Sequence, residues 1–279
     1  MSRATLADVL QPALAQGYAV AGMVCLGWED TRAYVAAAEA ENSPVILQAG
    51  PGCREHTPLT VLGAMFGHLA DNASVPVVLH LDHGYEMEEC RTAIESGFTS
   101  VMYDGSSKPL EQNIAETAAI VEMAHKAGVS CEGEIGFVGY ADGAQSAGTD
   151  PEDAARFALE TKADAVAISI GNVHLQRGSG DGLDENLLAA IEAQTSCPLV
   201  IHGGSGVPIL QREKLSRHSK ICKFNIGTEV RSIFGHSLRS ALDADPDIFD
   251  RNAILKQVHG PLEDAARTIF RTLGSSQKA

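Results

Sequence analysis

Residues 77–83 read VVLHLDH, a short apolar run that ends in two groups able to bind a metal or move a proton. A run of this length, rich in β-branched and aliphatic residues, predicts a strand buried on both faces. The same pattern recurs along the chain, with segments of helical character between the runs. Eight strands are predicted in this way: residues 19–26, 45–48, 77–81, 100–103, 130–134, 165–170, 199–201 and 223–226.

The segments between these strands carry helix signals. Residues 110–126 end at Ala127-Gly128, as a helix with a C-terminal glycine does, and Pro151 opens a further helix at its first turn. Eight buried strands that alternate with helices favour one closed α/β fold, a (β/α)8 TIM barrel, over an open doubly wound sheet. We expect residues 1–279 to form this single domain, with extra C-terminal helices after Asp243.

Composition excludes several classes of function. The formal charge of −15 and the lack of a Lys/Arg cluster argue against nucleic-acid binding. Neither a signal peptide nor an apolar run of about 18 residues is present, which predicts a cytoplasmic protein that does not enter a membrane. The six cysteines are scattered without a C-x-x-C pair, so a metal would have to be bound by histidine and carboxylate.

Polar residues gather at the carboxyl ends of the predicted strands, which meet at one mouth of a barrel. They are Asp82, His83, Asp104, Glu132, Glu134, His174, His202 and Asn225. Taken singly, each is more simply a structural histidine or a helix cap. Together, three histidines and a carboxylate without thiolates suit Zn²⁺ or another borderline divalent ion. His80 points deeper into the barrel, and we expect it to be a buried structural residue.

Two glycine-containing loops follow the last two strands. His202 leads into Gly203-Gly204-Ser205, and Asn225 leads into Ile226-Gly227-Thr228. Glycine lets backbone amides approach a ligand closely, and these two loops are the usual phosphate site of a (β/α)8 barrel. A glycine-rich loop alone is more often a simple turn, but the pair indicates a small phosphorylated substrate.

The chain resembles the class II fructose-bisphosphate and tagatose-bisphosphate aldolases. The resemblance rests on LHLDH at 79–83, SVMYDGS at 100–106, HGGSG at 202–206 and NIGT at 225–228. It implies that zinc is bound by His83, His174 and His202, with Glu134 as an alternative or additional ligand. It also implies that Asp82 is the acid/base for the hydroxyl beside the scissile bond.

The implied reaction is reversible cleavage of a phosphorylated ketose to dihydroxyacetone phosphate and an aldehyde. Such a cleavage needs a base and an electron sink, and a divalent cation can be that sink. Asn225 is expected to hydrogen-bond the enediolate, Ser106 and the Gly203–Ser205 amides to hold the phosphate, and Asp104 to orient a histidine. A monovalent cation near the phosphate and a homodimer or homotetramer are further expectations. A Schiff base is disfavoured, because the only lysine near a strand end is Lys223, at the start of its strand.

Three departures from the family pattern bear on the substrate. Met23-Val24-Cys25 stands where relatives carry an asparagine, and Leu175 stands where they carry a glycine after the histidine. The segment 137–149 is short and holds a single carboxylate, Asp142, as the expected catalytic group for the second proton transfer; a simple turn is the alternative. These departures leave two other hypotheses: a non-catalytic relative that stabilises a partner subunit, and a metal-dependent hydrolase on the same barrel.

Overall fold

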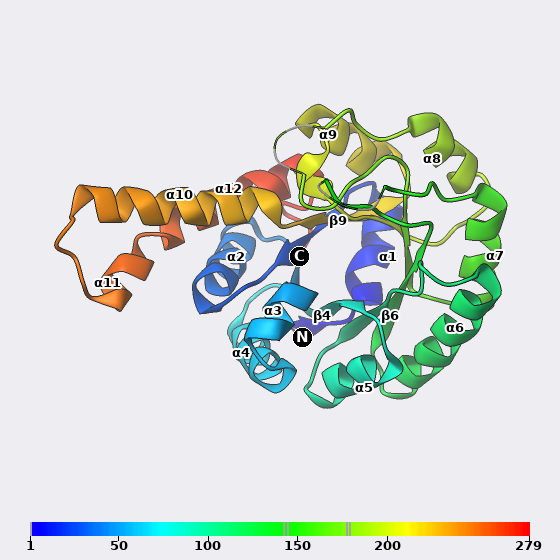
Figure 1. The fold of residues 1–279 in the computed structure, drawn as a ribbon, viewed down its shortest axis with the longest axis horizontal. Helices are drawn as coiled ribbons and strands as arrows, with labels where there is room; N and C mark the ends of the chain where they lie inside the picture. The colour runs from blue at the N-terminus through cyan, green and yellow to red at the C-terminus, as the bar shows by residue number, and fades with distance from the viewer. Residues whose placement is uncertain (1, 142, 144, 177, 179) are drawn as a thin grey trace.

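The computed structural model describes residues 2–141, 143, 145–176, 178 and 180–279, and its centre is a closed parallel barrel (Figure 1). Eight strands follow one another around the ring, and pairing between β4 and β5 closes it. The (β/α)8 TIM barrel predicted from the sequence is therefore confirmed. The strands are β2 (Val20–Val24), β3 (Val45–Ala49), β4 (Val77–Gly84), β5 (Ser100–Tyr103), β6 (Ser130–Ile135), β7 (Ala165–Ile168), β8 (Leu199–Ile201) and β9 (Ile221–Ile226).

Helices surround the barrel, and a short helix, α3 (Pro51–His56), follows β3. The outer helices are α2 (Trp28–Glu41), α4 (Leu59–Asn72), α5 (Met87–Glu95), α6 (Leu110–Lys126), α7 (Pro151–Thr161), α8 (Glu185–Glu192), α9 (Ile209–His218) and α12 (His259–Leu273). Helix α6 begins and ends at the predicted residues. Within the described residues, no helix is long and apolar enough to cross a membrane.

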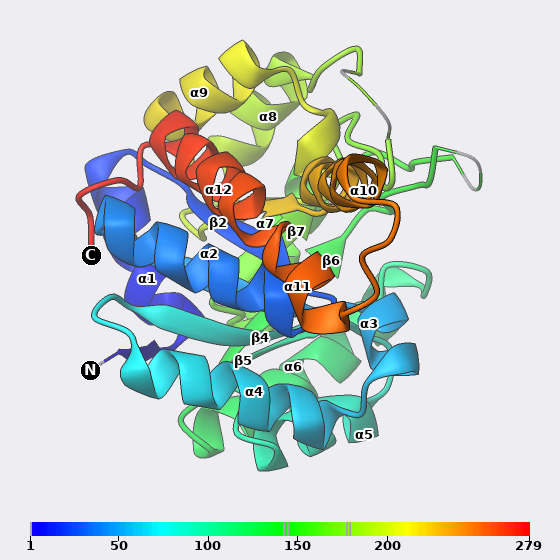
Figure 2. The ribbon, with the colours of Figure 1, turned by 90° about the vertical axis from the view of Figure 1, so that its left-hand side faces the viewer.

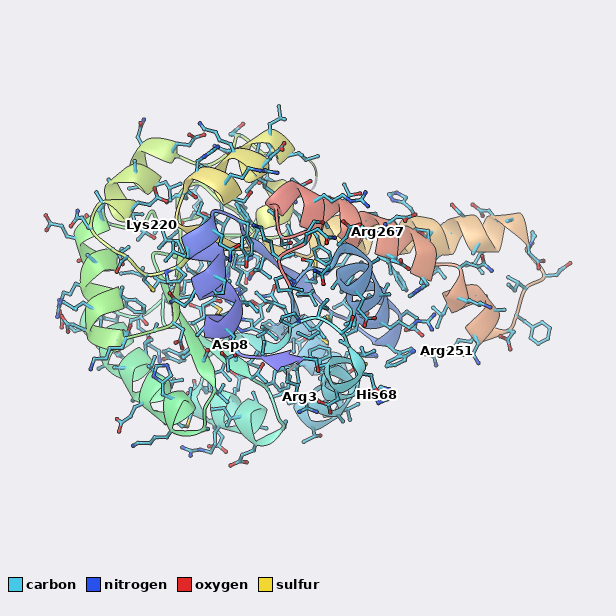
Figure 3. The ribbon with its side chains drawn as sticks, turned by 180° about the vertical axis from the view of Figure 1, so that it is seen from behind. Arg3, Asp8, His68, Lys220, Arg251 and Arg267 are labelled. Atoms are coloured by element: carbon cyan, nitrogen blue, oxygen red, sulfur yellow. The ribbon has the colours of Figure 1, made fainter. Side chains whose placement is uncertain are left out.

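The N-terminal segment fills one end of the barrel. Strand β1 (Arg3–Ala4) pairs with the start of β4, and α1 (Leu6–Gln16) then lies across the ring, in front when the molecule is viewed from behind (Figure 3). Thr5 and Asp8 form a capping box that fixes where α1 begins. Leu6, Val9, Leu10 and Ala13 of α1 are buried in a cluster that includes barrel residues such as Ile46 and Met102. A ligand site must therefore lie at the opposite, C-terminal end.

The C-terminal helices divide into an arm and a barrel helix. Helices α10 (Thr228–Ala244) and α11 (Arg251–Lys256) project away from the barrel (Figure 1), and Val230 is the one buried residue of α10. Helix α12 then returns along α2 (Figure 2), where Glu41 accepts hydrogen bonds from Arg267 and Arg271. The extra helices expected after Asp243 thus include one, α12, that completes the outer ring.

Strand β4 is irregular at its carboxyl end. Its register with β5 pairs Leu81 with Val101 and Gly84 with Tyr103, so it shifts between Leu81 and Gly84. Asp82 and His83 lie in this bulge, and His83 has a left-handed backbone with φ of 52°. Bulges next to active sites turn side chains in directions that a regular strand does not allow.

Candidate active site

A cavity of about 300 Å³ opens at the C-terminal mouth of the barrel. Residues from the ends of β2, β4, β8 and β9 and from the loop after β7 line it together with α3. Among the predicted site residues, the cavity brings together Asp82, His83, His174, Gly203, Ser205, Asn225, Gly227 and Thr228. These residues, predicted at strand ends and in the two glycine loops, therefore line one cavity.

Three imidazoles converge at this cavity: His83 and His174 line it, and His202 is fully buried next to them. One ring nitrogen from each of His83, His174 and His202 lies within 4.8 Å of the other two. His83 Nε2 and His202 Nδ1 are 2.9 Å apart and face each other. Burial lowers the pKa of His174 to about 4, so its imidazole is neutral. Burial also acts to lower the pKa of His83, but the charges of Asp82, Asp104 and Glu134 outweigh it and raise this pKa to about 9, so a bound cation would have to displace the proton of His83.

The carboxyl group of Glu134 lies beside these nitrogens and is almost fully buried. Its Oε2 has no hydrogen-bond partner among the described residues and lies 3.8 Å from His83 Nδ1 and 3.5 Å from His202 Nδ1. Burial, together with the nearby Asp104, raises the pKa of Glu134 to about 8. A buried, unpartnered carboxyl oxygen next to converging imidazoles fits a divalent cation.

Asp104 fixes the orientation of His83. Its Oδ2 lies 2.9 Å from His83 Nδ1, which leaves Nε2 of His83 directed at the other imidazoles. The other oxygen, Oδ1, accepts from the hydroxyl and the amide of Ser106 at 2.6 and 3.1 Å. The contact agrees with the predicted orienting role of Asp104. Ser106, however, lines a second cavity of about 180 Å³ and not the one that the glycine loops line.

A buried polar network of Glu132, Lys223 and His80 lies on the side of His202 away from His83. His202 Nε2 lies 3.0 Å from Glu132 Oε1, and Lys223 Nζ donates to Glu132 Oε2 at 2.7 Å. His80 lies beside Lys223 and contacts the Ser100 hydroxyl at 2.8 Å, so the predicted structural position of His80 is confirmed. Glu132 leaves Nδ1 of His202 for a metal, and Lys223 is held by an ion pair with no exposed surface.

Asp82 is held as an ionised carboxylate. Gln48 Nε2 and Asn225 Nδ2 donate to its Oδ1 at 2.9 and 3.2 Å. Burial raises its pKa, but the positive charges of His83 and neighbouring groups outweigh burial and hold the pKa of Asp82 below its ordinary value. Gly22 makes room for both amides, since a Cβ there would lie 2.2 Å from Gln48 Oε1. Gln48 ends a predicted strand, but no motif in the sequence indicates a role for it at the site.

The two glycine loops lie side by side. Gly203 has φ of 65°, and a Cβ there would lie 2.2 Å from the carbonyl oxygen of Val173, so only glycine is accommodated. Ser205 Oγ accepts from the amides of Gly227 and Glu229 at 3.1 and 3.3 Å, which joins the loops and leaves the hydroxyl proton free to be donated. Gly204 is buried behind the cavity wall.

Arg231, on the first turns of α10, also lines the cavity. It is the one Lys or Arg among the described lining residues. Arg231 was not among the predicted site residues, because a single arginine in a helical segment carries no sequence signal of a site. A fixed positive charge at this place complements an anionic ligand in a chain of strong negative charge.

The segment after β6 packs against His174. Backbone hydrogen bonds join Ala141 N to His174 O and His174 N to Gly139 O, and the ring of Tyr140 lies 5.0 Å from that of His174. Leu175 keeps the left-handed conformation, φ 57°, that a glycine adopts readily. Asp142, the predicted second catalytic carboxylate, lies outside the described residues. Val24, within the stretch 23–25, lines the cavity.

Comparison with known proteins places this site in a family. The chain matches the family model of fructose-bisphosphate aldolase class-II over residues 4–278. It is 37% identical over 292 residues to a fructose-bisphosphate aldolase of Geobacillus stearothermophilus, with 100% of this chain and 99% of the relative covered. It is 36% identical over 282 residues to the 6-phospho-5-dehydro-2-deoxy-D-gluconate aldolase of Shouchella clausii, with 98% and 95% covered. The solved structure of the YdjI aldolase from Escherichia coli K12 has a TM-score of 0.87 at 30% identity, covering 99% of both chains. The chain belongs to the class-II fructose-bisphosphate aldolase family and is an aldolase, a lyase.

Proposed function

We propose that this chain is a zinc-dependent aldolase that reversibly cleaves a small phosphorylated ketose to dihydroxyacetone phosphate and an aldehyde. One observation carries the proposal. His83 and His174 line the same cavity as the carboxylate of Asp82 and the two glycine loops, and a ring nitrogen of the buried His202 lies within 4.8 Å of a nitrogen of each. A metal site, a base and an anion site within one cavity are what this cleavage requires.

His83, His174 and His202 would hold the zinc ion, with Glu134 as the alternative or additional ligand. When bound, the ion supplies a Lewis acid that stabilises the negative charge developing on the ketone side of the scissile bond. Asp104 and Glu132 orient His83 and His202, and the free ring nitrogens of these two residues face each other, where they would hold the ion.

Asp82 takes the proton from the hydroxyl next to the scissile bond. Its carboxylate is ionised and already receives two amide hydrogen bonds on Oδ1. Its Oδ2 accepts no hydrogen bond from the described residues and lies near Gly50, which lines the cavity with Asp82, so this oxygen is the one that can meet the substrate. Asn225 lies beside it and can donate to an oxygen of the enediolate.

The phosphate of the substrate binds where the two glycine loops meet. The amides near Gly203 and Thr228 and the hydroxyl of Ser205 supply donors, and Arg231 supplies a positive charge. A monovalent cation beside the phosphate stays a prediction. The two curated relatives are named for different substrates, so the proposal for this chain extends to the class of phosphorylated ketoses and not to one sugar.

The decisive experiment combines metal content with a substrate panel. The chelator-stripped and zinc-reloaded protein should contain about one zinc per chain and should release dihydroxyacetone phosphate from at least one ketose mono- or bisphosphate. His174→Ala should lose both the zinc and the activity, whereas the matched control His68→Ala, an exposed position on α4, should lose neither.

Other outcomes of this experiment would contradict the proposal. Release of inorganic phosphate in place of dihydroxyacetone phosphate would favour a metal-dependent hydrolase. Full zinc loading without any cleavage would favour a non-catalytic partner-stabilising subunit.

A further inference from the structure

Arg54, on the short helix α3, binds the backbone that carries the proposed base and one proposed metal ligand. Its guanidinium donates to the carbonyl oxygens of Ala49 at 2.8 Å, Asp82 at 2.7 Å and His83 at 2.9 Å. The side chain is only 9% exposed. The planar fork of a guanidinium can reach several acceptors at fixed angles, which a lysine ammonium on a flexible stem cannot do.

The two carbonyls of Asp82 and His83 belong to the bulge at the end of β4. The ladder with β5 is interrupted between Leu81 and Gly84, so the strand pairing does not hold this backbone in place. His83 also has φ of 52°, a region that costs a non-glycine residue of the order of 1 kcal/mol or more. A conformation of this kind persists only where its surroundings hold it, and Arg54 supplies two hydrogen bonds at this point.

The bulge determines where the side chains of Asp82 and His83 point. A one-residue change of register in a strand would direct a side chain to the opposite face. The same guanidinium also holds α3 and the loop before it, where Gly50, Pro51, Gly52 and Cys53 line the cavity. Arg54 therefore ties a wall of the cavity to the proposed base and ligand.

The ion pair between Arg54 and Glu89 does not explain why the Arg54 side chain is buried against the β4 bulge. Glu89 Oε1 lies 3.4 Å from the guanidinium, and its other oxygen accepts from the amide of Tyr85 at 2.7 Å. A long and partly exposed ion pair contributes little to stability. The three hydrogen bonds from the Arg54 guanidinium to backbone carbonyl oxygens are shorter than this ion pair.

We propose that Arg54 is a positioning residue of the aldol reaction, which holds the β4 bulge so that the Asp82 carboxylate and the His83 imidazole face the cavity. The inference rests on the proposed function, because it assigns Asp82 and His83 their roles. Arg54 itself touches neither substrate nor metal and acts through the two carbonyl groups.

The test uses Arg54→Ala and Arg54→Lys, with Arg91→Ala as the matched control, since Arg91 is exposed on α5 and pairs with Glu88. Both Arg54 variants should lose about 10- to 100-fold in kcat and in zinc affinity, measured by competition with a chelator, while KM changes less than threefold. Millimolar methylguanidinium should restore at least a tenth of the lost kcat of Arg54→Ala, and methylammonium should restore none. Arg91→Ala should match the wild type throughout.

Several results would overturn the inference. Near-normal kcat and zinc affinity in folded Arg54→Lys would do so, and so would a lowered melting temperature in Arg54→Ala with no loss of kcat per folded molecule. If the wild type cleaves no phosphorylated ketose, the proposed function fails, and the zinc affinities of the same variants still decide whether Arg54 positions His83.

Discussion

The two carboxylate oxygens of Asp82 have different surroundings. Two amide groups, from Gln48 and Asn225, donate to one oxygen, and the other lies near Gly50, which lines the cavity with Asp82. This arrangement holds the carboxylate in place and keeps it ionised. A base that is held in this way can remove a proton without first reorganising water.

Replacement of Asp82 by asparagine tests this role directly. The amide keeps the shape of the side chain and can still accept a hydrogen bond from Gln48 or Asn225, but it cannot accept a proton. Asp82→Asn should lower turnover by about 100-fold or more while zinc content and melting temperature stay close to those of the wild type. Normal turnover in a single-turnover assay would remove Asp82 from the mechanism.

For single residues, the sequence predicted which side chains lie at the site better than it predicted their hydrogen-bond partners. The strand-end rule brought Asp82, His83 and His174 together, because the carboxyl ends of parallel strands must meet at one mouth. It could not predict that the Ser106 hydroxyl is engaged by Asp104, two residues away, since local hydrogen bonding competes with a ligand contact. No sequence pattern pointed to Arg54, because its proposed positioning role depends on the bulge in β4, a strand that is distant from Arg54 in the sequence.

Among the secondary-structure elements, α2 and α12 are joined by one buried carboxylate. Glu41, at the end of α2, accepts hydrogen bonds from Arg267, Arg271 and the hydroxyl of Ser276. The hydrogen bonds from Arg271, with those from Ser276 and Arg267, outweigh burial and lower the pKa of Glu41 from 4.5 to about 2. This carboxylate links two helices that lie more than 200 residues apart in the chain.

The pH dependence of stability should show this contact. Because the folded-state pKa of Glu41 lies below its ordinary value, its contribution is complete above about pH 4.5 and is lost as the pH falls towards 2. Glu41→Gln should therefore lower the free energy of unfolding by about 1 kcal/mol at pH 7, a modest value because both arginines are partly exposed to solvent. Chemical denaturation at several pH values should show the two proteins converging below pH 3. A difference independent of pH would assign the loss to packing.

The elements were predictable to different degrees for physical reasons. Residues 100–103 and 199–201 were predicted at their observed ends, because buried parallel strands are continuous apolar runs with sharp boundaries. The role of α1 could not be predicted, because an amphipathic helix at the start of a chain does not reveal which surface it covers. Helix α12 was likewise expected outside the barrel, since only its packing on α2 places it in the ring.

For the molecule as a whole, α1 is part of the barrel core. Leu10 has no exposed surface and lies in the cluster that fills the N-terminal end. Leu10→Ala should cost about 2–5 kcal/mol of unfolding free energy, because the rigid ring cannot collapse into the space left behind. The control Leu210→Ala, at a position that is 79% exposed, should change the unfolding free energy by less than about 0.5 kcal/mol. Equal effects would show that α1 packs loosely and does not belong to the core.

Because α1 fills the N-terminal end of the barrel, ligands can reach the site only from the C-terminal end. With α1 across one end, the cavity at the other end would be the passage by which substrate arrives, both products leave and the proposed zinc ion is exchanged. A ketose phosphate seated between the glycine loops and His174 would then block the way to the ion. The enzyme should lose zinc to a chelator several-fold more slowly when it is saturated with a slowly cleaved substrate, so that a working molecule retains its metal longer than an idle one.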